Sequence, residues 1–186
     1  SEARDLFALT REGNIYSRAA NPTVLVFEQR VAELEGGVSA AAVASGQAAV
    51  ALALLALAKQ GEHIVAARQL YGGTVDLLQD TFVDWGIEVT FVDKDDPEAW
   101  SAAVRPTTRA LFAESITNPN AQVLDIRAVA AVARAARVPL VIDHTVATPY
   151  LQRVKDFGAD IVVHSATKYL GGHGTSLGGV IVDLGT

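Results

Sequence analysis

Short apolar runs that alternate with helix-like segments limit most strongly what this sequence can fold into. Such runs lie at residues 63–67, 110–114, 140–143 and 161–164. Strands without polar alternation are expected where helices cover both faces of a sheet, and parallel strands need a crossover helix between them. We therefore predict an α/β fold with three layers, α/β/α, around a mostly parallel sheet.

The remaining elements follow from periodicity and from helix-end signals. Asn21 and Pro22 are expected to start a helix that Gly36 and Gly37 end. An Ala/Leu-rich helix over 47–58 has almost no polar face, and we expect it to be buried on all sides. Further helices are predicted at 74–85, 97–104, 125–137 and 150–157, and further strands at 87–92 and 179–183. Residues 1–20 are expected to be irregular and to reach a neighbouring subunit, ahead of one domain over 21–186.

Composition excludes several classes of function. The chain has 15 Lys+Arg against 21 Asp+Glu, a net charge of −6, which argues against a nucleic-acid partner or an anionic membrane surface. No apolar run approaches the ~20 residues of a membrane span, and no signal-peptide pattern opens the chain. Without cysteine there is no disulfide and no cysteine-bound metal, and the four histidines lack metal-ligand spacing. We expect a cytoplasmic protein without a metal site.

Ligands of open α/β sheets bind beyond the carboxyl ends of the strands, so the polar residues there are the candidate site. Lys168 follows a strand, close to Ser165, Thr167 and a glycine-rich loop. A desolvated lysine suits Schiff-base chemistry, whereas an ordinary surface lysine is equally compatible with the local sequence. Asp143 ends an apolar strand, where a buried carboxylate needs a partner, although a helix N-cap is the better interpretation of this residue taken alone.

Three further groups complete the candidate site. The N–H groups of Ser45-Gly46-Gln47 at a helix start can hold a phosphate or form a plain N-cap. Tyr71 can stack on a ring or simply pack, and Asn118 with Glu114 can be ordinary turn chemistry. Together these residues supply a Schiff-base lysine, a carboxylate for a ring nitrogen, a phosphate cradle and an aromatic plate, which is what pyridoxal phosphate (PLP) requires.

At this point the sequence resembles the Cys/Met-metabolism PLP enzymes, which have the large domain of the aspartate-aminotransferase fold (type I). The matching segments appear in family order: Tyr16-Ser17-Arg18, Asn21-Pro22-Thr23, Leu34-Glu35-Gly36-Gly37, Ala44-Ser45-Gly46-Gln47-Ala48, Leu70-Tyr71-Gly72-Gly73-Thr74, Glu114 with Asn118-Pro119-Asn120, Asp143 with Thr145, and His164-Ser165-Ala166-Thr167-Lys168-Tyr169.

The resemblance implies a role for each residue. Lys168 would form the Schiff base and move protons, Asp143 would pair with the pyridine nitrogen, and Tyr71 would stack on the ring. The other implied cofactor contacts are Ser45, Gly46, Gln47, Ser165 and Thr167 at the phosphate, Asn118 near the phenolic oxygen, and Tyr16 and Arg18 at the phosphate of a neighbouring subunit. A homo-oligomer, as a dimer of dimers, is therefore expected.

Within the family, the run over 171–175 resembles the O-acetylhomoserine sulfhydrylase branch. This branch forms L-homocysteine and acetate from O-acetyl-L-homoserine and sulfide, in methionine and cysteine metabolism. The alternatives are a methionine γ-lyase, a cystathionine γ-synthase or γ-lyase, or a truncated chain that binds cofactor without turnover. An unrelated nucleotide-binding domain is disfavoured, because no P-loop or strand-linked G-x-G-x-x-G motif is present.

Two features depart from the family pattern. His144 stands where the family has Asn, so an imidazole lies beside the proposed partner of the ring nitrogen and is expected to affect cofactor geometry. The chain is also less than half as long as family members, has no methionine, and stops just after a strand-like run. We expect a piece of a longer protein that lacks the smaller C-terminal domain.

Overall fold

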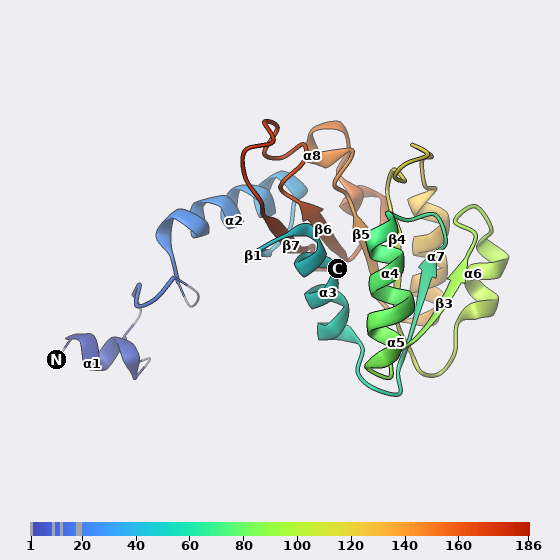
Figure 1. Cartoon of the computed structure of the whole chain (residues 1–186), viewed down its shortest axis with the longest axis horizontal. Coiled ribbons are helices and arrows are strands. Elements are labelled where there is room, and N and C mark those ends of the chain that lie inside the picture. Colours follow the sequence, from blue (N-terminus) through green and yellow to red (C-terminus); the bar gives the residue numbers. More distant parts are fainter. Residues whose placement is uncertain (1, 9, 12, 18–19) are drawn as a thin grey trace.

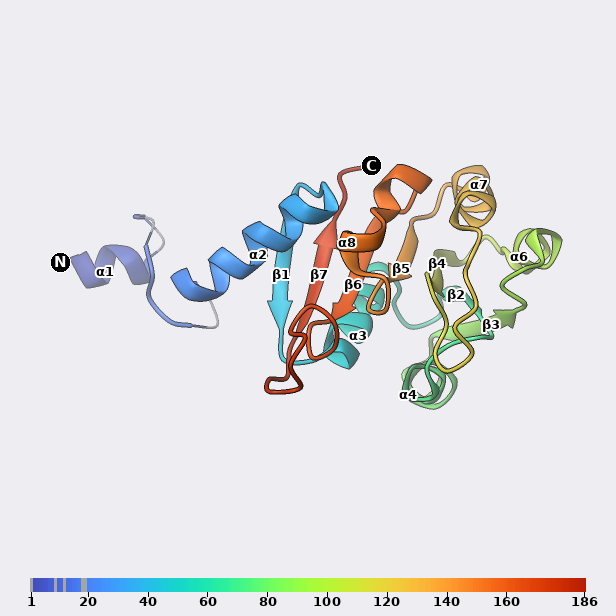
Figure 2. The same ribbon diagram turned by 90° about the horizontal axis from the view of Figure 1, so that it is seen from above.

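The computed structural model describes residues 2–8, 10–11, 13–17 and 20–186. Its centre is a seven-stranded sheet with the strand order β1-β7-β6-β5-β4-β2-β3. Helices α3 and α4 lie on one side of this sheet, and α2, α6 and α7 lie on the other (Figures 1 and 2). The predicted three-layer α/β arrangement is confirmed.

The strands are β1 (Ser39–Val43), β2 (His63–Ala67), β3 (Glu88–Val92), β4 (Thr108–Glu114), β5 (Leu140–Asp143), β6 (Ile161–Ser165) and β7 (Gly179–Asp183). The five strands β3, β2, β4, β5 and β6 are parallel, and β7 pairs antiparallel with both β6 and β1. The sequence analysis missed β1, because its Ser-Ala-Ala-Ala-Val sequence has one β-branched residue, Val43, and three alanines, which are depleted in strands.

The helices are α1 (Glu2–Phe7), α2 (Pro22–Glu35), α3 (Gly46–Leu57), α4 (Gly72–Asp76), η1 (Leu77–Thr81, π), α5 (Phe82–Asp84), α6 (Pro97–Ala103), α7 (Ile126–Ala136), α8 (Thr148–Leu151) and η2 (Val154–Phe157, 3-10). The predicted ends of α2 are confirmed. The Asn21 side chain accepts hydrogen bonds from the N–H groups of Thr23 and Val24, and Gly36 ends the helix at φ +72°.

Three expectations for the helices need correction. The helix expected over 74–85 is continuous but begins at Gly72 and contains the π-helical turn η1. The helix expected over 150–157 divides into α8 and η2. The α3 helix is not buried on all sides, because Leu52 is 50% exposed on its outer face. An apolar composition does not reveal whether both faces of a helix are covered within the chain.

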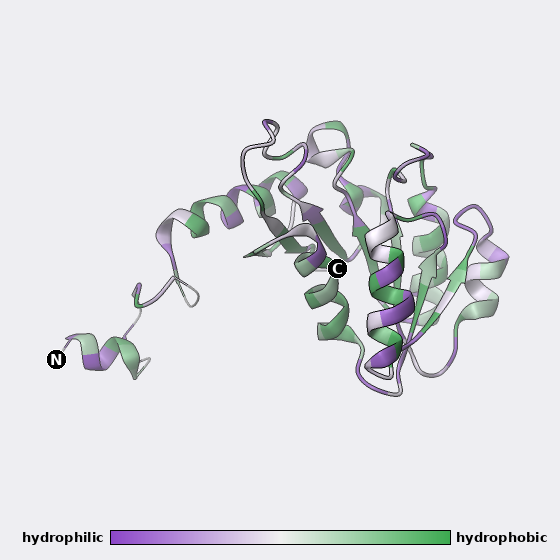
Figure 3. Ribbon diagram, viewed as in Figure 1, coloured by the Kyte–Doolittle hydropathy of each residue, from purple (hydrophilic) through white to green (hydrophobic). Residues whose placement is uncertain are grey.

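The hydrophobic core lies on both faces of the sheet. All five residues of β2 are buried, and the largest fully buried side chains include Trp100, Phe82 and Phe112. In Figure 3 the helix formed by α4 and its continuation lies in front and carries both hydrophilic and hydrophobic residues, while the strands behind it are mostly hydrophobic. Continuous burial of the strands explains why they read as unbroken apolar runs.

The N-terminal arm, whose described residues begin with α1, projects beyond the layered body in both views (Figures 1 and 2). The expectation of an irregular segment over 1–20 therefore misses one short helix, Glu2–Phe7, which has no buried residue. Within the described part of the chain, no helix has the length and apolar character needed to cross a membrane.

Candidate active site

The candidate site lies at the carboxyl ends of β2, β4, β5 and β6. These strands run parallel, so the turns that follow them gather at one edge of the sheet. Strand β1 runs in the same direction as β6, because both are antiparallel to the β7 strand between them. The end of β1 therefore delivers the start of α3 to this same edge.

The N-terminus of α3 presents free backbone donors. The Ser45 hydroxyl caps the helix by accepting from the Ala48 N–H at 3.1 Å, and the Ser45 carbonyl accepts from the Ala49 N–H. The first N–H groups of a helix have no partner inside it, so those of Gly46 and Gln47 remain available to a ligand. Ser45 is thus a plain N-cap, while its two neighbours supply the donors of an anion site.

Gly46 packs directly against the end of β6. A Cβ atom on Gly46 would lie 2.5 Å from Ser165 Cβ, a distance that only glycine avoids. Gly179, at the start of β7, approaches the Ser45 carbonyl even more closely, since a Cβ there would lie 2.0 Å from its oxygen. These contacts place the Ser165 hydroxyl beside the free donors of α3, as a phosphate cradle requires.

Asp143 is held by Thr145 at the end of β5. Its Oδ1 accepts from the Thr145 N–H at 3.0 Å and from the Thr145 hydroxyl at 2.6 Å. The Thr145 hydroxyl in turn accepts from the Ser165 N–H at 2.8 Å. Burial raises the pKa of Asp143, while the bonds from Thr145 oppose this rise. A cation near this carboxylate would stabilise its ionised form.

Tyr71 and Gln47 lie together on the other side of the α3 N-terminus. A Cβ on Gly73 would lie 2.7 Å from Tyr71 Cε1 and 3.3 Å from Gln47 Nε2, so the glycine leaves room for both side chains. Gln47 Nε2 donates to the Thr74 hydroxyl at 3.2 Å. The Tyr71 side chain is 49% exposed, which leaves part of its ring open to a ligand.

Glu114 connects two of the candidate residues, and the sequence analysis gave it no role beyond ordinary turn chemistry. Its Oε1 accepts from the Tyr71 N–H at 2.6 Å, and its Oε2 accepts from the Asn118 N–H at 2.9 Å. Burial raises the pKa of Glu114 to about 7; the charge of Asp143 raises it too, and the two N–H groups oppose the rise. The signal in the sequence was an acidic residue that ends an otherwise apolar strand.

Lys168 lies in the turn after β6 and is exposed. Its backbone N–H donates to the Ser165 carbonyl at 3.2 Å, and the structure gives its ammonium no bond to any described residue. The Thr167 hydroxyl is bonded to the backbone of Gly178, as donor at 3.3 Å and as acceptor at 3.1 Å. Thr167 thus closes the base of the glycine-rich loop that follows Lys168.

A buried pair lies behind this turn. His164 Nε2 donates to Glu35 Oε1 at 2.6 Å, and both side chains are fully buried. The remaining polar atoms of the pair, His164 Nδ1 and Glu35 Oε2, have no partner in the described part of the chain. The pair joins the end of α2 to the last residues of β6, and so supports the segment that leads to Lys168.

His144 is buried, and its ring bonds to residues in two neighbouring loops. Its Nε2 donates to the Gln152 carbonyl at 2.8 Å, and its Nδ1 lies 2.7 Å from the Ser115 hydroxyl. Burial lowers the pKa of His144, so the ring is neutral at pH 7 and Nδ1 accepts from Ser115. The ring therefore links Ser115, just after β4, and Gln152, just after α8, to the residue that follows β5.

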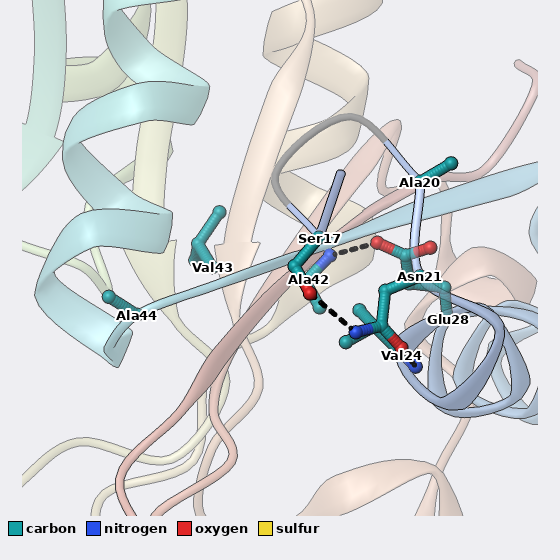
Figure 4. A pocket seen from close by; sticks show the side chains of 8 residues that line it. All are labelled: Ser17, Ala20, Asn21, Val24, Glu28, Ala42, Val43 and Ala44. Atoms are coloured by element: carbon teal, nitrogen blue, oxygen red, sulfur yellow. Dashed lines mark hydrogen bonds between the residues drawn. The ribbon is translucent and has the colours of Figure 1, made fainter. Parts of the chain in front are cut away.

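Two predicted residues are not gathered with the others. Tyr16 belongs to the projecting N-terminal arm and is 61% exposed, while Arg18 lies outside the described residues. Near the arm, an open pocket lies between the start of α2 and the end of β1 (Figure 4). In it Glu28 Oε1 accepts from the Ala42 N–H at 2.8 Å, which covers a donor of the sheet's edge strand. No group of three or more His, Asp or Glu side chains among the described residues could hold a metal ion.

The comparison with protein families decides what these residues belong to. The family model of the Cys/Met metabolism PLP-dependent enzymes matches residues 1–186. The chain is a member of that family. Its curated relatives include the O-acetyl-L-homoserine sulfhydrylases of Leptospira meyeri, 55% identical over 99% of this chain, and of Corynebacterium glutamicum, 53% identical over 98%. The chain spans 42% of the length of each of these two relatives.

Solved structures of Cys/Met-metabolism enzymes have the same fold. A crystal structure of an O-acetylhomoserine (thiol)-lyase from Campylobacter jejuni matches 98% of this chain, and 45% of its own chain, with a TM-score of 0.93 and 40% identity. That protein carries a pyridoxyl-lysine monophosphate. An O-acetylhomoserine sulfhydrylase from Wolinella succinogenes matches 89% of this chain, and 47% of its own, with a TM-score of 0.83 and 45% identity.

The residues at the sheet edge fit PLP, the cofactor of this family. The free N–H groups of Gly46 and Gln47 and the nearby Ser165 hydroxyl suit its phosphate. The partly buried Asp143 carboxylate suits its ring nitrogen, which carries a proton when PLP acts as an electron sink. Lys168, whose Nζ has no bond to any described residue, suits its carbonyl group.

Proposed function

We propose that the protein catalyses a PLP-dependent γ-replacement in which O-acetyl-L-homoserine and sulfide give L-homocysteine and acetate. The observation that supports this most strongly is the identity of 55% and 53% to two proteins named O-acetyl-L-homoserine sulfhydrylase, over nearly the whole chain. The site supports the same proposal, because its donors, carboxylate and lysine meet the needs of the cofactor.

We assign the candidate residues as follows. Lys168 Nζ attaches the cofactor and later moves protons at the substrate carbons. Asp143 holds the proton of the ring nitrogen, Tyr71 covers the ring, and Asn118 lies near its phenolic oxygen. Ser165, Thr167 and the N–H groups of Gly46 and Gln47 bind the phosphate, behind the N-cap Ser45. When bound, PLP withdraws electrons from the α-carbon of an amino acid and makes its protons acidic.

We also propose a homo-oligomer, in which Tyr16 and Arg18 reach the cofactor phosphate of a neighbouring subunit. The projection of the N-terminal arm beyond the layered body supports this assignment (Figure 2). Residues 21–186 then form the cofactor-binding large domain. The cytoplasm is the compartment we propose for this enzyme of amino-acid metabolism.

The test uses the protein at its full natural length, loaded with PLP. It is incubated with O-acetyl-L-homoserine and sulfide, and homocysteine and acetate are quantified. We expect both products in equal amounts, no product from Lys168→Ala, and normal rates from Lys59→Ala, which removes an exposed lysine remote from the site. Two parallel incubations, one with methionine alone and one with O-acetyl-L-homoserine and cysteine, test the alternatives. Faster cleavage of methionine, or faster formation of cystathionine, than formation of homocysteine would contradict the proposal.

The acyl group of the substrate needs a separate comparison. An O-succinylhomoserine sulfhydrylase from Pseudomonas aeruginosa is 42% identical to this chain, less than the acetyl-named relatives. We therefore expect a higher kcat/KM with O-acetyl-L-homoserine than with O-succinyl-L-homoserine. A higher kcat/KM with O-succinyl-L-homoserine would instead make that compound the preferred substrate.

A further inference from the structure

Glu114 occupies a position that the assigned roles do not use. It is the last residue of β4, its side chain is 5% exposed, and it stands in register with Asp143 on the neighbouring strand β5. Burying a carboxylate is costly unless it is bonded, so the arrangement of its two oxygens indicates what it does.

Each oxygen of Glu114 accepts from one backbone N–H, that of Tyr71 at 2.6 Å and that of Asn118 at 2.9 Å. Both residues lie outside helices and strands, and neither N–H donates to another acceptor among the described residues. Two loops that follow different strands are therefore fixed to a single side chain. Both N···O distances are at or below the usual ~2.9–3.0 Å of such bonds, so this bridge restrains both loops.

We propose that Glu114 is a positioning residue that fixes the backbone at Tyr71 and Asn118, and thereby sets where their side chains meet the cofactor. This inference rests on the proposed function, which places those two side chains against the ring and its phenolic oxygen. In this proposal Glu114 acts through these two residues and does not itself bind the cofactor or the substrate. A purely structural role would stabilise the two loops without affecting cofactor binding.

The first test needs no cofactor. Amide hydrogen exchange at Tyr71 and Asn118 is measured by NMR in the cofactor-free protein at its full natural length. In wild type both amides should be protected, although they lie in loops. In Glu114→Gln, one of the two should exchange at least about tenfold faster, because a carboxamide offers one acceptor oxygen where the carboxylate offers two. Glu98→Gln, an exposed residue on α6, should change neither.

The second test separates positioning from simple support. PLP is titrated into each variant, and the dissociation constant, the visible absorption maximum and the kcat and KM are recorded. We expect Glu114→Gln to weaken PLP binding about tenfold and to shift the absorption maximum. Borohydride reduction should still attach the pyridoxyl group to Lys168 in this variant. Glu114→Asp keeps the charge but is too short to reach both donors, so its values should lie between those of wild type and Glu114→Gln.

The outcomes are distinct. Unprotected amides at Tyr71 and Asn118 in wild type overturn the bridge itself, even if no variant folds. If Glu114→Gln speeds amide exchange at Tyr71 or Asn118 but leaves the PLP affinity and the spectrum unchanged, Glu114 has a structural role only and the proposal is overturned. A wild-type protein that forms no borohydride-reducible band refutes the proposed function instead, whatever the exchange rates are.

Discussion

The hydroxyl of Thr145 lies 2.6 Å from Asp143 Oδ1 and donates to it, and the same hydroxyl accepts from the Ser165 N–H at 2.8 Å. One small side chain thus joins the ends of β5 and β6. Its bond favours the ionised form of Asp143, against the burial that raises the pKa of this carboxyl. Thr145 therefore couples the proposed partner of the ring nitrogen to the proposed phosphate cradle.

Replacing Thr145 tests this coupling. Thr145→Val keeps the shape but removes both bonds, so the Ser165 N–H loses its acceptor and Asp143 loses a donor. We expect the free energy of unfolding to fall by about 1–3 kcal/mol and PLP binding to weaken. Urea unfolding and a PLP titration measure the two effects. Thr107→Val, at an exposed position, is the control and should change neither.

The packing of Gly46 against Ser165 makes a second prediction. The methyl group of Gly46→Ala would lie 2.5 Å from Ser165 Cβ and 2.8 Å from its Cα, so the α3 N-terminus must move away from β6. We expect a loss of about 1–3 kcal/mol in stability and weaker binding of PLP. Gly72→Ala is the matched control, because no atom lies within 4 Å of a Cβ at that position. Equal behaviour of the two variants would show that the close approach at Gly46 is unimportant.

The buried pair behind Lys168 makes a third prediction. Glu35→Ala leaves His164 fully buried without its partner, because the Glu35 carboxylate is the group bonded to its Nε2. Breaking a buried pair in this way costs about 3–5 kcal/mol. Glu33→Ala removes an exposed carboxylate from the same helix, and should cost far less. Thermal or urea unfolding compares them; a similar, small loss in both would mean that the pair contributes little.

Glu114 predicts a dependence of stability on pH. Its pKa is raised to about 7 in the fold from a reference value of 4.5, so between these values the folded state binds more protons than the unfolded state. The stability of the cofactor-free protein relative to Glu114→Gln should therefore fall as the pH rises from 4.5 to 7, by about 3 kcal/mol. Urea midpoints for both proteins across this range measure the difference. A constant difference would contradict the raised pKa.

The strands and the edge of the site could be predicted because their signals are local. Asp143 ends one short apolar run and Lys168 closely follows another. Continuous apolar runs of this length are typical of parallel strands that are covered by helices on both faces. The β1 strand could not be predicted, because an alanine-rich edge strand carries no such signal. The open face of α3 at Leu52 and the pair of Glu35 with His164 depend on tertiary packing.

Glu114 shows the same limit within the site. The sequence marked it as a neighbour of Asn118 in a turn, which is correct, since its Oε2 accepts from the Asn118 N–H. Its second contact, with Tyr71, spans 43 residues of sequence and depends on β2 and β4 being adjacent in the sheet. Register between strands is set by the whole fold, so local patterns do not reveal such a bridge.

The central claim is that Lys168 holds PLP at this sheet edge. The most direct measurement is to incubate the protein with PLP, reduce it with borohydride, digest it and locate the pyridoxyl group by mass spectrometry. We predict a single modified peptide that carries the group on Lys168, and none in Lys168→Ala. A pyridoxyl group on another lysine, such as the buried Lys94, or no modification at all, would contradict the account.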